Sequence, residues 1–163
     1  MSDEAGAHSA YASGTVSAAD SLVGGLRLPA DKSVAHRALL FNAMAEGEAE
    51  VTAARPGEDV LSMASVLQTL GAVESIGEGP VGYTRVRIRG GGTRQLAALP
   101  GSGGEILDCG NAGTAMRLLI GALSGRSAAA TLTGDASLSG RPMERVAAPL
   151  RRVGADLVTE DGP

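Results

Sequence analysis

Residues 28–37 read Leu-Pro-Ala-Asp-Lys-Ser-Val-Ala-His-Arg. The segment leaves a short predicted strand over 26–29, turns at the proline, and enters a predicted helix over 33–45 with Ser33 as its N-cap. A strand, a turn and a helix entrance that carries a basic residue recur at 105–123. This repeated junction predicts a mixed α/β fold.

The other elements follow the same order in both halves. The first half continues with segments that periodicity and turn residues delimit, namely a strand at 49–54, a helix at 59–70 capped by Asp59, and strands at 73–75 and 83–89. The second half predicts a strand at 105–108, a helix at 114–123, a strand at 128–133, a helix at 142–153 and a strand at 155–159. Equivalent positions lie about 80 residues apart, which indicates one supersecondary unit used twice, over about 26–92 and about 105–163.

Composition excludes several functional classes. The 163 residues include 14 Lys and Arg against 18 Asp and Glu, for a formal net charge of -4, and only 2% are aromatic. Such a chain lacks the basic field and the stacking platforms of a nucleic-acid binder. One cysteine and two histidines exclude an internal disulfide, a four-cysteine zinc site and a histidine-rich metal centre. We interpret Cys109 as a small buried apolar residue and not as a nucleophile, because no histidine is placed to activate it.

The N-terminal segment differs from the rest of the chain. Residues 1–21 are rich in Ala, Ser and Gly without periodicity, and we expect a disordered tail there and a folded region over 22–163. The acidic N-terminus lacks the apolar stretch of a signal peptide. No apolar run reaches the ~18 residues of a membrane-spanning helix. We therefore expect no membrane association and a cytoplasmic location.

Cations stand at the first predicted helix entrance. A helix N-terminus exposes unpaired N–H groups and a partial positive charge, and therefore attracts anions. Lys32 lies at this entrance, and Ser33 and Arg37, four residues apart, share one helix face. An ammonium, a hydroxyl and a guanidinium together suit a phosphate or a carboxylate. The alternative is a capped helix with two solvated charges, with His36 on the helix surface.

The entrance of the helix predicted over 114–123 carries glycines where the first entrance carries Lys32. Residues 108–114 read Asp-Cys-Gly-Asn-Ala-Gly-Thr. Gly113 lets a ligand approach the backbone, Thr114 can cap the helix, and Arg117 lies one turn further on. Arg141 is a third cation at a predicted helix start. A tight structural turn and a solvated arginine are the alternatives here.

Three segments taken together resemble the EPSP synthases, the family of 3-phosphoshikimate 1-carboxyvinyltransferases. They are residues 28–37, residues 107–118 (LDCGNAGTAMRL) and residues 132–143 (LTGDASLSGRPM). The resemblance covers about 26–158. It implies repeated β-α-β-α-β-β units, six in all, in the two-domain enolpyruvyl transferase fold, an inside-out α/β barrel. This chain would be a truncated N-terminal portion with two of those units, and its partner would be the remainder of the enzyme chain.

The resemblance also implies a reaction. The family transfers the carboxyvinyl group of phosphoenolpyruvate to the 5-hydroxyl of shikimate 3-phosphate and releases phosphate, as a step of the shikimate pathway to chorismate and the aromatic amino acids. It uses no metal and no other cofactor. Both substrates are phosphorylated carboxylates, so several cations must meet several negative charges in a cleft that excludes water.

By motif, the resemblance assigns five residues to the substrates: Lys32, Ser33 and Arg37 to shikimate 3-phosphate, and Lys32, Gly113 and Arg141 to phosphoenolpyruvate. The family's catalytic residues are expected beyond Pro163, and the isolated fragment is expected to be inactive. UDP-N-acetylglucosamine enolpyruvyl transferases share the fold, but the sequence around Lys32 and His36 argues against them. A non-catalytic anion-binding module is a further alternative.

Overall fold

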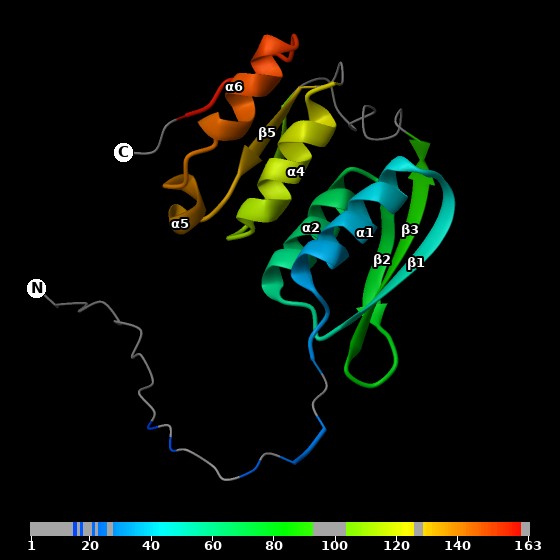
Figure 1. Ribbon diagram of the computed structural model, residues 1–163. Helices are drawn as coiled ribbons and strands as arrows, with labels where there is room; N and C mark the ends of the chain where they lie inside the picture. Colours follow the sequence, from blue (N-terminus) through cyan, green and yellow to red (C-terminus); the bar gives the residue numbers. More distant parts are fainter. Residues whose placement is uncertain are drawn as a thin grey trace, which may run out of the picture.

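The computed structural model describes residues 28–92, 104–125 and 129–160, together with Thr15, Ser17, Ser21 and residues 23–25. Within these ranges the elements form two blocks that follow one another along the chain (Figure 1). Most of the predicted tail over 1–21 lies outside the described residues. The prediction of disorder there therefore stays a prediction.

The first block is a three-stranded antiparallel sheet with two helices on one face (Figure 1). Its elements are α1 (Lys32–Met44), β1 (Glu46–Ala54), α2 (Glu58–Thr69), β2 (Val73–Glu78) and β3 (Tyr83–Gly91). The strand order is β1-β3-β2, so the last strand lies between the other two. The predicted elements of this half, from the helix at 33–45 onward, are confirmed, with β1 starting three residues earlier and β2 ending three residues later.

The strand predicted over 26–29 is not found in its described part. Leu28 and Pro29 have no strand assignment, and residues 26 and 27 lie outside the description. One backbone hydrogen bond connects this segment to the sheet, from the Ala30 N–H to the Ala54 carbonyl at 2.8 Å. Proline carries no N–H, which removes a ladder bond at the position where the predicted strand ends.

Both helix starts of the first block were predicted with the wrong cap. Asp31 is the N-cap of α1, since its carboxylate accepts from the Val34 N–H at 2.7 Å, and Ser33 lies inside the first turn. The N-cap of α2 is Gly57, so Asp59 also lies inside a first turn. Asp and Ser cap equally well, and the sequence could not rank two candidates this close together.

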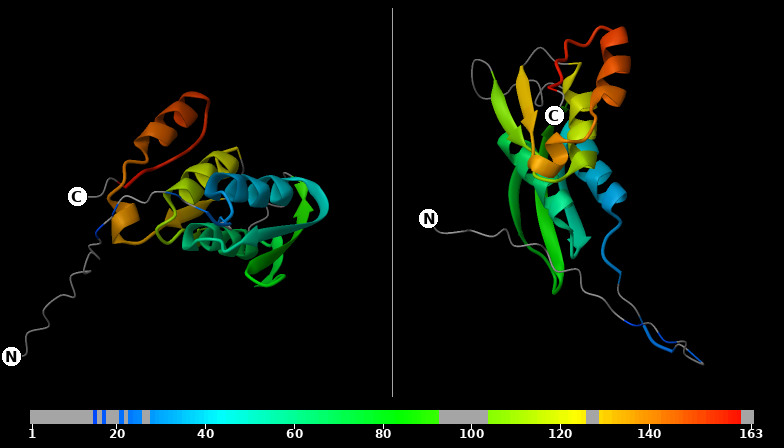
Figure 2. Two further views of the ribbon diagram at one scale, coloured as in Figure 1. Left: turned by 60° about the horizontal axis from the view of Figure 1, so that its bottom comes forward. Right: turned by 90° about the vertical axis from the view of Figure 1, so that its left-hand side faces the viewer.

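The second block begins with a parallel strand pair. Its elements are β4 (Glu105–Asp108), α4 (Gly113–Leu123), β5 (Ala130–Thr133), α5 (Ala136–Ser139) and α6 (Glu144–Arg152). The strands pair in register from Glu105 opposite Ala130 to Asp108 opposite Thr133, with α4 as the crossover. Figure 2 shows α4 between the helices of the first block on one side and α6 on the other.

Three predictions for this block were wrong. The helix predicted over 142–153 is found as α6, but the unpredicted α5 precedes it, and Arg141 lies between the two helices and not at a helix start. The segment 155–159 is not a strand. It is attached to α6 through the side chain of Arg151, whose Nε donates to the Leu157 carbonyl at 2.7 Å. Finally, Thr114 does not cap α4, because the N-cap is Ala112 and makes no side-chain bond.

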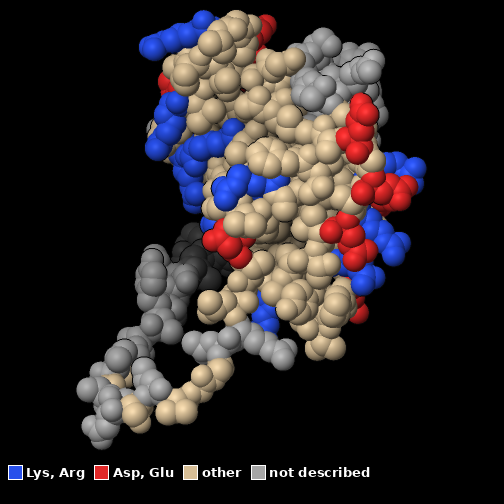
Figure 3. All heavy atoms as spheres, turned by 45° about the vertical axis from the view of Figure 1, so that its right-hand side comes forward, with Lys and Arg blue, Asp and Glu red and all other residues tan. Residues whose placement is uncertain are grey.

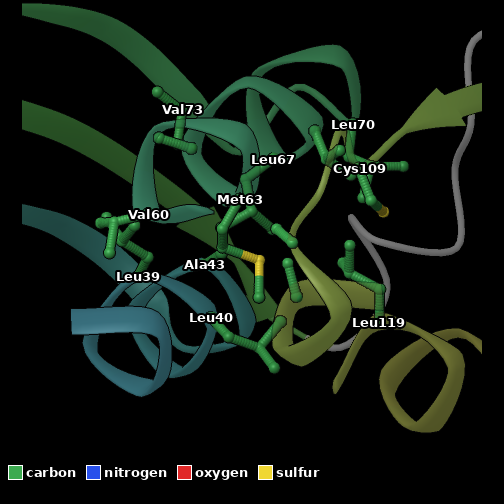
Figure 4. Close-up of a cluster of buried hydrophobic side chains, with 14 of the residues drawn as sticks. Leu39, Leu40, Ala43, Val60, Met63, Leu67, Leu70, Val73, Cys109 and Leu119 are labelled. Atoms are coloured by element: carbon green, nitrogen blue, oxygen red, sulfur yellow. The ribbon is translucent and has the colours of Figure 1, made fainter. Parts of the chain in front are cut away.

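One hydrophobic core joins the two blocks. Helices α1, α2 and α4 contribute most of it, with fully or nearly fully buried side chains that include Leu39, Leu40, Met63, Leu67 and Leu119 (Figure 4). Because these helices contact one another directly, the two blocks share one core. The three helices run in the same general direction, so their N-termini face the same end of the molecule (Figure 1).

Candidate anion-binding site

The N-terminus of α1 presents the first group of predicted residues. Lys32 lies in the first turn, and its ammonium forms an ion pair with Asp59 of α2, with Nζ and Oδ2 2.9 Å apart. The lysine side chain is 58% exposed, so this ion pair is open to a ligand. Ser33 and Arg37 are exposed one turn apart, and Arg37 makes no ion pair with any described residue.

His36 is the residue of this helix that sequence reasoning misjudged. Predicted as helix surface, it is fully buried, with 0% of its area exposed. Its Nδ1 lies 2.6 Å from the Lys32 carbonyl oxygen, and its Nε2 lies 3.2 Å from the Asp59 carbonyl oxygen. The ring therefore connects the starts of α1 and α2.

The N-terminus of α4 brings the second group together. An added Cβ on Gly113 would lie 3.1 Å from Nη1 of Arg117 and 3.2 Å from Nη1 of Arg141. Gly113 thus faces two guanidinium groups, and neither forms an ion pair with a described carboxylate. The half-buried Arg117 also has an Nε without a hydrogen-bond partner. Arg117 was noted at this entrance but was missing from the five assigned residues.

Arg141 is held in place by a chain of side chains. Its Nη2 donates to the Asn111 Oδ1 at 2.7 Å, and the Asn111 Nδ2 donates to Asp135 at 2.7 Å. Only this orientation of the amide satisfies both neighbours. Asp135 also accepts from the Leu138 N–H at the start of α5, at 2.8 Å. That backbone hydrogen bond, followed by the one from Asn111, lowers the pKa of Asp135, so the Asp135 carboxylate stays ionised.

A groove of about 660 Å³ is lined by one contact partner of each group. It runs between α2 and the turn before α4. Asp59, the partner of Lys32, lines one side, and Asn111, the partner of Arg141, lines the other with Asp135. None of the five assigned residues lines the groove itself. The structure therefore brings Gly113 and Arg141 together, and relates Lys32 to them only through the side chains that border one groove.

Other arginines are differently placed. Figure 3 shows Lys and Arg gathered along one edge of the viewed face, and acidic and basic groups mixed along the opposite edge. On the sheet, Arg85, Arg87 and Arg89 form ion pairs with glutamates of neighbouring strands, namely Glu48, Glu50 and Glu74. Because these cations already have partners, they are poorer candidates for a ligand than Arg37, Arg117 and Arg141.

Cys109 lies in the turn between β4 and α4 and is fully buried. Burial, with a smaller contribution from the charge of Asp108, raises the pKa of its thiol to about 11. The thiol therefore stays protonated at neutral pH and is a poor nucleophile. This burial agrees with its interpretation from the sequence.

Two features are absent from the part of the chain that the structure describes. No helix there has the length and apolar character needed to cross a membrane. No three His, Cys, Asp or Glu side chains there gather closely enough to hold a metal ion.

Fold and site define a mixed α/β protein with cations at successive helix entrances. The chain belongs to the EPSP synthase (3-phosphoshikimate 1-carboxyvinyltransferase) family, whose sequence model matches residues 16–162. It is 45% identical over 148 residues to the 3-phosphoshikimate 1-carboxyvinyltransferase of Herpetosiphon aurantiacus, covering 90% of this chain and 32% of that protein. The enzyme of that name from Synechococcus sp. (strain WH7803) is also 45% identical, over 142 residues, which cover 86% of this chain and 30% of the relative.

A solved structure shows the same relationship. The EPSP synthase from Acinetobacter baumannii superposes with a TM-score of 0.67 at 44% identity, over 82% of this chain and 28% of that one. The resemblance found in the sequence is therefore confirmed at the level of the family. The chain spans about 30% of the length of the curated relatives it matches.

Proposed function

We propose that this chain takes part in transferring the carboxyvinyl group of phosphoenolpyruvate to the 5-hydroxyl of shikimate 3-phosphate, with release of phosphate. The names of the relatives support the reaction. The observation that carries the site is the position of Gly113 against Arg117 and Arg141, two guanidinium groups that form no ion pair with a described carboxylate. Such a pair at a helix N-terminus suits a small ligand with two anionic groups.

We also propose the finer architecture that the resemblance implies. Residues 22–163 would form part of an inside-out α/β barrel, with two units over about 26–92 and about 105–163. The order α1, β1, α2, β2, β3 supports the first unit. The order β4, α4, β5, α6 supports the second, with the short α5 as an addition.

In the proposed site, α1 binds shikimate 3-phosphate. The Lys32 ammonium, the Ser33 hydroxyl and the forked Arg37 guanidinium would each donate to the phosphate or carboxylate oxygens. The Lys32–Asp59 ion pair does not prevent this. An exposed pair is worth at most about 1 kcal/mol, whereas a hydrogen bond to a charged group contributes about 1.5–3 kcal/mol. A dianionic ligand can therefore take the lysine from Asp59.

The start of α4 binds phosphoenolpyruvate in this proposal. Arg117 and Arg141 would meet its phosphate and carboxylate, and the missing side chain of Gly113 leaves the room. Because Asn111 holds Arg141 before the ligand arrives, less conformational entropy is lost on binding. Lys32 would be shared by the two substrates.

Calorimetric titration of the chain with three ligands tests this proposal. We expect heat of binding from shikimate 3-phosphate, weaker binding of phosphoenolpyruvate, and none of UDP-N-acetylglucosamine. A matched titration with shikimate, which lacks the phosphate, shows how much of the affinity depends on that group. Binding of UDP-N-acetylglucosamine without binding of shikimate 3-phosphate would instead support the UDP-N-acetylglucosamine enolpyruvyl transferases, and the proposal would be abandoned.

A further inference from the structure

Three contacts close a ring between the first turns of α1 and α2. The Lys32 and Asp59 side chains form their ion pair at 2.9 Å. The backbone carbonyls of the same two residues both face the ring of His36, at 2.6 Å from Nδ1 and 3.2 Å from Nε2. One buried imidazole thus contacts the backbone of both members of an exposed ion pair.

The chemistry of this ring is asymmetric. Carbonyl oxygens only accept hydrogen bonds, and a neutral imidazole carries one N–H. The shorter contact, to Lys32, is the one that follows the helix, four residues back. The longer contact reaches Asp59, 23 residues away in another helix. The ring therefore donates one hydrogen bond, and its body fills the space between the two helix starts, which neither helix can span by itself.

Burial makes this position unusual. His36 is the one polar or charged residue in the buried set of the described chain, and its neighbours in α1 on the core side are apolar. A buried polar group is costly unless it is hydrogen-bonded, so an apolar residue would serve the core at least as well. What an apolar residue cannot supply is a contact with the two carbonyls.

We propose that His36 is a positioning residue of the shikimate 3-phosphate site, in that it holds α1 and α2 at the spacing that aims Lys32 at its ligand. The inference rests on the proposed function for the identity of the ligand. The geometric part, that His36 sets the Lys32–Asp59 pairing, stands independently of any ligand. The two parts can be measured separately.

The sequence offers a direct probe, because Lys32 is its only lysine. Reductive methylation with ¹³C-formaldehyde labels this amine and the N-terminal amine alone, and a Lys32→Arg variant identifies which NMR signal belongs to Lys32. The dimethylated ammonium keeps its positive charge and one N–H, so it can still pair with Asp59. Its chemical shift then reports the ion pair, with Asp59→Asn as the reference for the broken state.

We expect His36→Leu to move the Lys32 signal toward its position in Asp59→Asn. The unlabelled variant should bind shikimate 3-phosphate about tenfold more weakly than the wild type, the loss that follows when one charged contact is misplaced. His36→Gln keeps one hydrogen-bond donor, so its Lys32 signal and its affinity should lie between those of the wild type and His36→Leu. This variant also provides a test if the leucine variant fails to fold. Leu39→Ala, which opens a cavity in α1 outside the ring, should lower thermal stability and change neither readout.

The outcomes separate the two ideas. If the Lys32 signal in both folded His36 variants stays where it is in the wild type, the positioning role is wrong, whatever the affinities are. If that signal moves but the wild-type chain binds no shikimate 3-phosphate, His36 does set the Lys32–Asp59 pairing, and the proposed function is wrong. If the signal moves and Leu39→Ala moves it equally, His36 acts only through general stability, and the inference is overturned.

Discussion

Arg141 and Asn111 stand 30 residues apart in the chain, yet the guanidinium Nη2 of one lies 2.7 Å from the amide Oδ1 of the other. This bond attaches the segment between α5 and α6 to the turn before α4. It brings Arg141 to Gly113 although the arginine does not start a helix. The second half of the candidate site therefore depends on an uncharged side chain.

Removing that side chain should weaken binding at α4. In Asn111→Ala we expect Arg141 to lose its support, and the affinity for phosphoenolpyruvate to fall by about 1 kcal/mol, the usual contribution of one hydrogen bond. Asn42→Ala is the matched control, since the Asn42 amide bonds within α1, to the Ala38 carbonyl. Calorimetry on both variants checks this, and equal affinities in the two would contradict it.

Gly113→Ala should separate ligand binding from stability. The new methyl group would press on the movable ends of Arg117 and Arg141, so the fold should tolerate it while phosphoenolpyruvate binds about tenfold more weakly. Gly121→Ala lies in the same helix with open space around it, and should stabilise the chain by about 0.5–1 kcal/mol without affecting the ligand. Chemical denaturation and titration of both variants give the comparison. Unchanged phosphoenolpyruvate binding in Gly113→Ala would remove this glycine from the site.

Gly90→Ala should destabilise the first block. A Cβ at this position of β3 would collide with the backbone carbonyl oxygens of Ala45 and Asn42, at the end of α1, and backbone cannot move aside as a side-chain end does. We expect a loss of about 2–4 kcal/mol in the free energy of unfolding, the upper part of the range for single substitutions. Gly77→Ala, in β2 with open space around it, should cost far less. Urea denaturation of the two variants decides, and similar midpoints would show that this close approach is wrong.

The buried thiol should make stability depend on pH at the alkaline end. The pKa of Cys109 is raised from its ordinary value of 9.0 to about 11, so the unfolded chain releases the proton first as pH increases. The contribution of Cys109 to the free energy of unfolding should therefore be constant below pH 9.0 and fall between pH 9.0 and about 11, by up to about 3 kcal/mol. Cys109→Ala should flatten that decline, and denaturation across this pH range measures it. An equally steep decline in the variant would assign it to other groups.

Local patterns predicted the helices and the antiparallel strands well because each is a property of neighbouring residues. Apolar spacing and turn residues gave α1, α2, β3 and α4 to within a few residues. The failures needed information from elsewhere in the chain. The segment 155–159 has the composition of a strand but no strand beside it in the described structure, and a strand requires a partner.

The residues of the candidate site also divide into those that local patterns predict and those that depend on distant parts of the chain. Lys32 and Gly113 were placed at helix entrances correctly, because an entrance is a local feature. His36 was not recognised, because the carbonyl of Asp59 that makes it a buried connector belongs to another helix. The approach of both Arg117 and Arg141 to Gly113 could not be predicted from local patterns, because it depends on how the chain returns from α5 toward α4.

The central claim is that cations at the helix entrances bind phosphorylated carboxylates, and titration of shikimate 3-phosphate into Lys32→Ala and Arg37→Ala tests it most directly. Each variant should bind about 1.5–3 kcal/mol more weakly than the wild type, the range for a hydrogen bond to a charged group. Arg145→Ala, which removes an exposed charge from α6, controls for net charge and should bind as the wild type does. Wild-type affinity in both the Lys32 and the Arg37 variant would contradict the account.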